Sequence, residues 1–598
     1  MADERREIVI VGSGAGGAPL AQTLVAGGHD VLMLEKGPLL RTQAQSPDGL
    51  SDFKRDELFA TGAEKRLTVP GMANIGESFF SSHVEPDLND EPHVYRDTDG
   101  RDRATIEGYT AQVVGGGTQL YGGVSLRFTP DDLRLATFNA GRTDLRDDPT
   151  GEVEREARDW PVSYDELEPF YSEAERIVGL NGTRENQEKP ASGEHYQPPL
   201  EPNPISRFVA AGMDALGMKR YRTPLAVITR DHAPSGRTVP RDHETIKTAF
   251  VNRYGDPLGL KSNTWVSILA PMASSENFEL RANCNVTHLE ADGDRVTKVH
   301  YRDPMGGRRV VEAGTVVVAC SAIESVRLLA LSGQFDQAGF GERIHASGLL
   351  GRYFLTHCFG GASAVLPERA DKSQTLDSDW ATDHCARAEW VREQGLWAGG
   401  AIYNNTSDAA LPISLARTWQ AQDMDNIWKG YLGDTSIVGS GFEDYMDQNF
   451  GRRVSVSFMA NQVAQPDNRI ELHPTVRDKW GRAVAYVIKD WHSHDQVLMD
   501  VLANQCGEIL RRGGEGVQFS GQGSVGGQVS RIANHVLGGA RFGTDPSDSV
   551  LDPDCRAWEF QNLYVADGAF MPTSGGANPT LTIQANSLRV GQALLGRL

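Results

Sequence analysis

The sequence predicts an α/β fold, and three similar units along the chain indicate it. Near the N-terminus, EIVIVGSGAGG followed by HDVLMLEKG predicts a strand, a glycine-rich turn, a helix and a second strand that ends in an acid. Residues 314–333, GTVVVACSAIESVRLLALSG, have the same order of buried strand, short turn and helix. The last segment, NLYVADGAFMPTSGGANPTLTIQA, returns to strand, glycine-rich loop and helix.

The first glycine-rich turn has the spacing of a dinucleotide-binding site. Gly12 permits a tight turn after the strand, Gly14 lets the backbone approach a pyrophosphate, and Gly17 allows helix and strand to pack closely. The helix N-terminus supplies free N–H groups for a diphosphate. Glu35 ends the second strand, where a carboxylate can accept both ribose hydroxyls and disfavours the 2′-phosphate of NADP. The unit predicts an ADP-containing cofactor.

Composition sets limits on the class of protein. The 598 residues are 39% hydrophobic and 23% charged, which is ordinary for a globular protein. No apolar run approaches the roughly 18 to 20 residues of a membrane span, so we expect no membrane partner. The polar start MADERRE runs directly into the first strand and leaves no secretory signal, which favours a cytoplasmic location.

Cysteines and net charge exclude further classes of site. Six cysteines without any CxxC spacing give no indication of a metal site, and in a reducing compartment they are expected to be free thiols. The net charge of −21 argues against nucleic acid as a partner. It suits either a cationic substrate or simple solubility.

The middle of the chain carries four further patterns. VVGGGTQLYGGVSLRF (residues 113–128) is glycine-rich, and DWPVSYDELEPFYSEAERIVGL predicts a turn and an amphipathic helix. Residues 184–261 are polar and weakly periodic, which predicts irregular covering structure. Alternation over residues 278–303 predicts a hairpin at Asp292-Gly293-Asp294. Between residues 356 and 525, RRVSVSFMANQV and NRIELHP predict strands, and DQVLMDVLANQCGEILRRGG predicts a helix.

These blocks, in this order, resemble the glucose-methanol-choline (GMC) family of FAD oxidoreductases over nearly the whole chain. VVGGGTQLYGG matches the loop that covers the flavin in this family, here called the flavin loop, and NLYVADGAFMPTSGGANPTLTIQA matches its C-terminal block. These two blocks are most similar to the bacterial sugar and gluconate dehydrogenase branch, with pyranose oxidases more distant. The resemblance implies a Rossmann-like FAD-binding domain interleaved with a substrate-binding domain built on an antiparallel sheet covered by helices. The expected FAD-binding parts are residues 1–180, with the flavin loop, 241–355 and 526–598; residues 181–240 are the covering segment and 356–525 the substrate-binding domain.

The resemblance also implies which residues form the site. Those expected to contact FAD are Gly12, Gly14, Gly17, Glu35, Gly115, Gly116, Gly117, Thr118, Tyr121, Gly122, Gly123, Val124, Val286, Asp567, Gly568, Pro579 and Thr580. The catalytic pair of the family falls on His535 and Asn578. Some relatives attach FAD covalently through a His in the flavin loop, but residues 118–121 read Thr-Gln-Leu-Tyr, so we expect noncovalent FAD.

The two residue types suit alcohol oxidation. A neutral imidazole has a pKa near working pH and can remove a hydroxyl proton, so His535 is the expected general base. Asn578 can hydrogen-bond to the developing alkoxide, and it could equally serve as a helix N-cap before Pro579. We expect His357, His473, His492 and His494 to be structural.

The leading hypothesis is FAD-dependent oxidation of a CH–OH group of a sugar, glycoside or aminosugar, with an aminoglycoside intermediate as one substrate class. The alternatives are a non-redox lyase of the hydroxynitrile lyase type and a flavin-bearing scaffold without turnover. The expected electron acceptor is oxygen or a soluble carrier. The sequence does not indicate the oxidised carbon or the oligomeric state.

Overall fold

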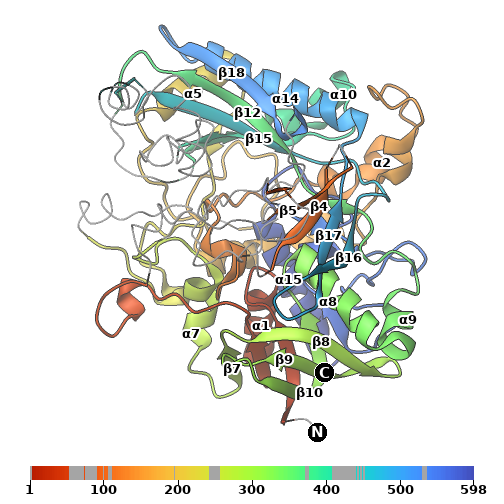
Figure 1. The fold of residues 1–598 in the computed structure, drawn as a ribbon. Helices are drawn as coiled ribbons and strands as arrows, with labels where there is room; N and C mark the ends of the chain where they lie inside the picture. The colour runs from red at the N-terminus through yellow and green to blue at the C-terminus, as the bar shows by residue number, and fades with distance from the viewer. Residues whose placement is uncertain are drawn as a thin grey trace.

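The computed structural model describes residues 3–52, 73–74, 91–97, 100–105, 111–193, 195–241, 256–370, 376, 378–406, 440, 444, 447–448, 451–527 and 535–598. In these ranges the chain forms a seven-stranded, a six-stranded and a five-stranded sheet and a two-stranded ribbon of β11 (Phe354–Leu355) and β19 (Leu537–Gly538). The seven-stranded sheet lies with α1, α8 and α15 in the lower half of Figure 1, and the six-stranded sheet lies under α14 at the top.

The seven-stranded sheet joins segments from both ends of the chain. Its order is β7 (Phe278–Arg281), β2 (Val31–Leu34), β1 (Glu4–Val11), β10 (Arg308–Val318), β9 (Arg295–Arg302) and β8 (Asn285–Asp292), with β20 (Leu563–Val565) pairing with the end of β10. Strands β7, β2, β1, β10 and β20 are parallel, whereas β8 and β9 form the predicted antiparallel hairpin. The carboxyl ends of β1, β10 and β20 therefore lie at one edge, where ligands bind in open α/β sheets.

Helices α1 (Gly17–Ala26) and α15 (Thr580–Leu595) pack against each other beside this sheet, although they are far apart in sequence. The Ser587 hydroxyl donates to the carbonyl oxygen of Gly16, so the last helix is attached to the first turn. Ile8, Val9 and Ile10 have no exposed surface. The predicted strand–turn–helix unit is thus confirmed as a buried element.

The six-stranded sheet is antiparallel throughout. Its order is β18 (Gln518–Ser524), β12 (Cys358–Val365), β15 (Arg453–Ala460), β14 (Gly400–Asn405), β13 (Trp380–Thr382) and β6 (Tyr221–Arg222). Helix α14 (Ser493–Arg511) covers one face and buries Leu498, Leu502 and Ile509 there. An antiparallel sheet covered by a helix is the architecture expected for this part of the chain.

The structure differs from the sequence prediction within residues 184–261. This stretch, predicted to be irregular, contains β6 and helix α5 (Ser206–Ala215), which packs against α14. Phe208, Val209 and Met213 recur at helical spacing and are buried in the same core as α14. The surrounding polar and proline-containing sequence conceals this short periodic run. The domain boundaries themselves stay a prediction.

A five-stranded sheet is attached to α8 (Ala322–Phe335) by buried charges. Its order is β16 (Arg469–Arg477), β17 (Ala483–Ile488), β4 (His93–Arg96), β5 (Asp102–Thr105) and β3 (Ala73–Asn74). The Arg327 guanidinium, on α8, donates to the Asp478 carboxylate at 2.7 Å and to the carbonyl oxygen of Ala483 at 2.9 Å. These bonds hold the small sheet against the nucleotide-binding part of the molecule.

The predicted amphipathic helix is α4 (Tyr164–Val178). It begins with a capping box, in which the Glu166 N–H donates to Ser163 Oγ and the Ser163 N–H donates to the Glu166 carboxylate. Shorter helices are α2 (Leu135–Asn139), α3 (Glu152–Glu156), α7 (Ala270–Met272), α9 (Glu342–Ile344) and α10 (Ala388–Glu393). Within the described ranges, no helix combines the length and apolar character needed to cross a membrane.

Helix α4 holds a buried ion pair that gives a test of this packing. Arg127 Nε and Nη2 donate to the Glu175 carboxylate at 2.7 and 2.9 Å, and neither side chain is exposed. Glu175→Gln removes the carboxylate that accepts two of the hydrogen bonds of the buried guanidinium and leaves, among the described residues, only Glu168, 3.0 Å from Arg127 Nη1, as its charge partner. We therefore expect the free energy of unfolding to fall by about 3–5 kcal/mol. Urea unfolding followed by tryptophan fluorescence measures this change.

The matched control is Glu173→Gln on the same helix. Glu173 pairs with Arg176 at the surface, where the two side chains are 42% and 46% exposed. We expect this variant to change the free energy of unfolding by less than about 1 kcal/mol. Equal effects of the two substitutions would contradict the assigned role of the Arg127–Glu175 pair.

Candidate active site

Three backbone turns meet at the carboxyl ends of β1, β10 and β20. Gly12 has φ +104°, and a Cβ there would lie 2.2 Å from the carbonyl oxygen of Ala319, just after β10. A Cβ on Gly16 would lie 2.6 Å from the carbonyl oxygen of Ala566, just after β20. Any side chain at these two positions would push the turns apart, so glycine is required for them to meet.

Glu35 lies at the end of β2 beside the first turn. Its carboxylate accepts hydrogen bonds from the N–H and hydroxyl of Ser13, at 3.1 and 2.6 Å, and from the N–H of Gly37 at 3.0 Å. Burial raises the pKa of Glu35, and these donors partly oppose that effect. The Glu35 carbonyl oxygen also accepts from the N–H of Cys284. This bond attaches the start of β8, two residues before Val286, to the end of β2. Val286 is 9% exposed, opposite Tyr301 in the hairpin.

The glycine-rich loop at residues 115–124 lies against the first turn. A Cβ on Gly116 would come within 3.1 Å of the Gly14 Cα, and the Gly115 N–H donates to the Ser13 hydroxyl at 2.9 Å. Thr118 bonds to the carbonyl oxygen of Gly115 at 2.6 Å and closes a short 3₁₀ turn over residues 116–119. Apart from its chain neighbours, no atom of the described residues lies within 4 Å of the position that a Cβ on Gly117 would occupy.

Residues 119–124 of this loop are held in place by hydrogen bonds to residues outside it. The buried Lys261 ammonium donates to the carbonyl oxygens of Gln119 and Tyr121 at 2.8 and 3.2 Å. The Tyr121 hydroxyl donates to the carbonyl oxygen of Ser262 at 2.8 Å. The remaining predicted residues of the loop pair with residues 225–226, since Gly123 accepts from the Ala226 N–H and Val124 forms a bridge with Leu225, while Gly122 lies between these anchors.

Asp567 and Gly568 begin the turn after β20. The Asp567 carboxylate accepts from the Ala569 N–H at 2.9 Å and from the Ser325 hydroxyl, and burial raises its pKa to about 6. A Cβ on Gly568 would lie 2.8 Å from the Leu537 side chain and 3.1 Å from the Val536 carbonyl oxygen. Gly568 therefore packs against the residues that directly follow His535.

His535 is brought to the site by a contact with a second histidine. Its Nδ1 atom lies 3.2 Å from Nδ1 of His357, and the two rings meet edge to face at 82°. Burial lowers the pKa of His535 to about 4, so its imidazole is neutral at pH 7. His357 has no exposed surface, and burial and then His535 lower its pKa well below the ordinary value.

Asn578 and the start of α15 lie next to the same histidine pair. The main-chain carbonyls of Ser574, Gly575 and Ala577 act on the His357 ring, so the loop that ends in Asn578 passes beside it. Pro579 is the N-cap of α15 and Thr580 its first residue. Within the part of the chain that the structure describes, the Asn578 side chain makes no cap bond, and its buried Oδ1 atom has no hydrogen-bond partner. The structure therefore does not favour the alternative in which Asn578 is only an N-cap.

Comparison with known proteins identifies the family. Two sequence models of GMC oxidoreductases match residues 161–358 and 464–587, together more than half of the chain. The chain is 30% identical to paromamine 6'-oxidase of Streptomyces fradiae over 99% of its own length and 92% of that protein. The chain belongs to the GMC oxidoreductase family. It is thus an FAD-dependent oxidoreductase, and its mixed α/β fold is that of the GMC flavoenzymes.

Other GMC proteins give the same result. The chain is 28% identical to 6'''-hydroxyparomomycin C oxidase of Streptomyces lividus over its whole length and 92% of that protein. An FAD-dependent oxidoreductase of Chaetomium thermophilum superposes with a TM-score of 0.57 at 14% identity, covering 99% of both chains. At this identity the superposition shows the shared fold alone.

The residues of the GMC site fit FAD. Besides the open approach at Gly14 and Gly117, several buried polar atoms near the site lack a hydrogen-bond partner within the described part of the protein: Gln119 Oε1, His357 Nε2, Gln462 Nε2 and Asn578 Oδ1. Unpaired buried polar atoms are costly unless a ligand or water pairs with them. A bound flavin and substrate supply such partners.

Three contributors to the site were not among the predicted site residues. Ser13 links Glu35 to the flavin loop, Lys261 holds residues 119–121 of that loop, and His357 contacts His535. Ser13 lies inside the glycine motif, so its position was available from the sequence. Lys261 and His357 carry no local signal, because their partners are more than a hundred residues away.

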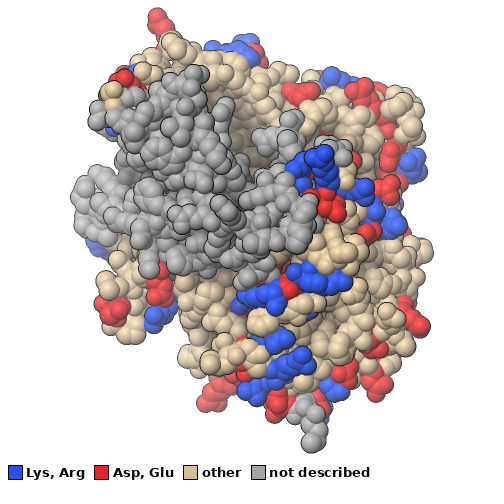
Figure 2. Space-filling view, viewed as in Figure 1, with Lys and Arg blue, Asp and Glu red and all other residues tan. Residues whose placement is uncertain are grey.

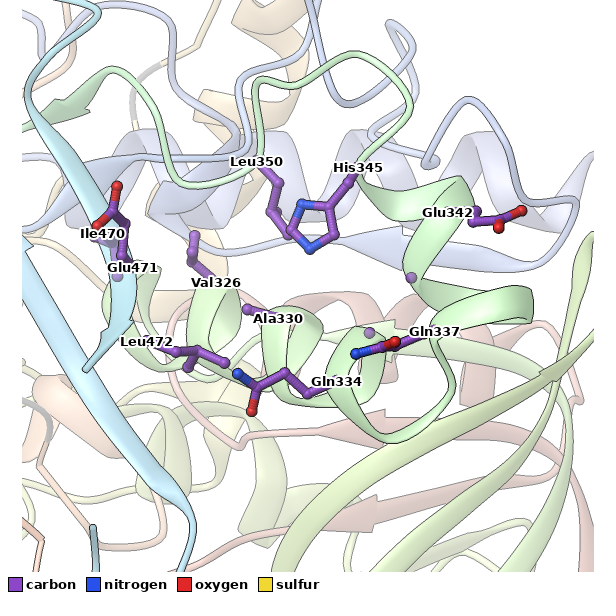
Figure 3. A pocket seen from close by; sticks show the side chains of 12 residues that line it. Val326, Ala330, Gln334, Gln337, Glu342, His345, Leu350, Ile470, Glu471 and Leu472 are labelled. Carbon is purple, nitrogen blue, oxygen red and sulfur yellow. The ribbon is translucent and has the colours of Figure 1, made fainter. Parts of the chain in front are cut away.

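A second hollow of about 510 Å³ lies further along α8, between that helix, α9 and β16. In Figure 3 the side chains of Leu350 and His345 point across it toward Ala330 and Gln334, and Ile470 and Leu472 close one side. None of the predicted site residues lines this hollow. We therefore place the reaction at the sheet edge and not here.

The glycine contacts predict opposite results for two similar substitutions. In Gly14→Ala the new methyl group is at least 3.8 Å from the other described residues, apart from its chain neighbours, so we expect folding to persist while FAD binding weakens at least about tenfold. In Gly17→Ala the methyl group would lie 2.0 Å from the Gly12 carbonyl oxygen, so we expect little folded protein. Circular dichroism and FAD titration of the apoprotein measure the two effects; a Gly14→Ala protein with unchanged FAD affinity would contradict the assigned approach.

Proposed function

We propose that this GMC protein oxidises a CH–OH group of a sugar, glycoside or aminosugar to the carbonyl, with His535 as general base and Asn578 as hydrogen-bonding partner of the reacting oxygen. The observation that carries the proposal is the partly buried, neutral His535 imidazole beside the loop that ends in Asn578. The cofactor contacts assigned above to residues 12–35, 115–124, 286, 567–568 and 579–580 belong to the same proposal.

The protein residues perform the proton half of the reaction. Nδ1 of His535 is engaged by His357, which leaves Nε2 as the nitrogen that takes the hydroxyl proton. The Asn578 amide orients the hydroxyl and hydrogen-bonds to the oxygen as negative charge develops there. When FAD is bound, its isoalloxazine ring accepts the hydride from the substrate carbon. The absence of a His in residues 118–121 supports noncovalent attachment of FAD.

One face of the six-stranded sheet is the proposed substrate wall. Val456 and Phe458 of β15 point to the α14 core, so the alternating residues Ser457 and Met459 point to the opposite face. Tyr403 of β14 is opposite Ser457. Ala401, also on β14, contacts the loop that ends in Asn578, since its N–H donates to the Gly576 carbonyl oxygen at 2.8 Å. The Tyr403 ring and the Ser457 hydroxyl on this face are the groups that we propose for contact with a sugar.

An aminosugar is the proposed substrate class. The two Streptomyces relatives are by name oxidases of aminoglycoside compounds, and the chain carries a net charge of −21, which attracts cations. On the face shown in Figure 2, acidic and basic side chains are interspersed, so the attraction there acts through the overall field and not through one acidic patch. For the electron acceptor we propose oxygen or a soluble carrier. All six cysteines are free, which supports a cytoplasmic location.

A substrate panel tests this class. Under anaerobic conditions we expect paromamine-type aminosugars to bleach the flavin absorbance near 450 nm faster than neutral sugars. We also expect the difference to shrink as ionic strength rises, because salt screens the attraction between the acidic protein and a polycation. Faster bleaching by neutral sugars would refute the aminosugar assignment, and bleaching by no alcohol together with cyanohydrin cleavage would support the lyase alternative.

His535→Asn tests the proposed base. Loss of a general base reduces rates by about 10²–10⁴, so we expect a fall of this size in the rate of flavin reduction, with the FAD content unchanged. In the wild type we expect kcat/KM to stay level from pH 8 to about pH 5 and to fall as the pH drops through the His535 pKa of about 4, because the protonated imidazole accepts no proton. The control is His29→Asn, which alters a surface histidine paired with Glu7.

A further inference from the structure

His357 was expected to be one of the structural histidines, but its surroundings are unusual for that role. It lies between β11 and β12 with no exposed surface, and its one hydrogen bond of ordinary geometry joins Nδ1 to Nδ1 of His535 at 3.2 Å. Among the described residues, its other ring nitrogen, Nε2, is buried without a partner of ordinary hydrogen-bond geometry. A buried nitrogen without a partner is destabilising, so an apolar side chain would serve packing alone better at this position. The contact with His535 therefore indicates a role for the imidazole beyond packing.

The contact between the rings constrains where the protons are. Two neutral imidazoles joined through their Nδ1 atoms require one donor and one acceptor. The main-chain carbonyls of Ser574, Gly575 and Ala577 act on the His357 ring and favour an N–H on it. Since Nδ1 of His357 faces His535, these carbonyls favour the proton on Nε2. His357 Nδ1 is then the acceptor, and His535 carries its proton on Nδ1.

We propose that His357 is a positioning residue that holds His535 in the tautomer with its proton on Nδ1, so that Nε2 has a free lone pair for the substrate hydroxyl. The inference rests on the proposed function, in which His535 is the base. The tautomer of a histidine is set by the hydrogen bond of its other ring nitrogen. Without the His357 acceptor, the proton is no longer held on Nδ1, and a His535 protonated on Nε2 accepts nothing from the substrate.

The position of His357 is itself rigid. The N–H of the preceding residue, Thr356, donates to Gln462 Oε1 at 2.8 Å, and the Gln462 N–H donates to the Ser574 hydroxyl at 2.9 Å. Asn461 accepts from the Gly575 N–H at 2.7 Å in the same network. These bonds connect the His357 backbone to the loop that carries Asn578. His357 and the loop that ends in Asn578 are therefore held in fixed positions relative to each other.

Three substitutions at residue 357 test the proposal in the holoenzyme. His357→Asn places an amide oxygen close to the former Nδ1, His357→Gln extends the amide toward the former Nε2, and His357→Leu fills the space without an acceptor. We expect Leu and Gln to lower kcat at least about 100-fold with KM nearly unchanged, and Asn to recover at least about tenfold of that loss. Thermal stability and FAD content are measured for each variant.

A spectroscopic readout follows the tautomer directly. In protein labelled with ¹⁵N-histidine, the His535 resonances are assigned by their loss in His535→Asn. We expect a protonated-type shift for Nδ1 and an unprotonated-type shift for Nε2 in the wild type and in His357→Asn, and loss of this pattern in His357→Leu. An unchanged His535 pattern in His357→Leu would overturn the proposal.

The outcomes separate this inference from the proposed function. If His535→Asn reduces flavin as fast as the wild type, His535 is not the base and the proposed function fails. If His535→Asn is inactive but His357→Leu keeps its kcat, only the positioning role fails. If His357→Leu does not fold, Asn and Gln decide, because equal loss of kcat in these two variants contradicts a requirement for an acceptor at Nδ1.

Discussion

The site depends on backbone contacts that leave no room for side chains. The turns after β1, β10 and β20 approach one another through Gly12 and Gly16, and the flavin loop reaches the first turn through Gly116. Because these contacts join main chain to main chain, they fix the positions of the ends of the parallel strands and of the loop relative to one another. The helix N-termini and N–H groups of these turns are held near one another by this single constraint.

The polar groups around these turns are held in linked pairs. Ser13 joins Glu35 to the flavin loop, Asp567 joins the last turn to α8, and His357 joins His535 to the loop before α15. Each pair connects segments that are distant in sequence. Positions at the chemistry are therefore set by several segments together, and no single loop sets them alone.

Local sequence signals predicted the elements whose partners are close in the chain. The strand, turn and helix around Gly12, the hairpin at Gly293 and the capped helix α4 all follow from spacing and turn chemistry. Helix α5 was not predicted, because its three apolar contacts appear only once α14 is packed on it. The fold and the cofactor thus followed from the sequence and its family resemblance.

The candidate site could be predicted only in part. His535 and Asn578 follow from the resemblance, but the contact of His535 with His357 spans 178 residues and leaves no pattern in either neighbourhood. The neutral state of His535 arises from burial, which is a property of the packed molecule. The same holds for Lys261, whose partners lie in the loop 140 residues before it.

The attachment of α15 to the first turn has a consequence for biosynthesis. The nucleotide-binding strands β1 and β2 leave the ribosome first, yet their sheet is completed by β20 and their turn is held by Ser587 near the end of the chain. Domains usually fold as they emerge, N-terminal parts first. Here β1 gains its second neighbour only when β10 has been made, and the first turn gains its contact with Ser587 only when nearly the whole chain has been made. We therefore expect stable cofactor binding to follow synthesis of the C-terminal helix.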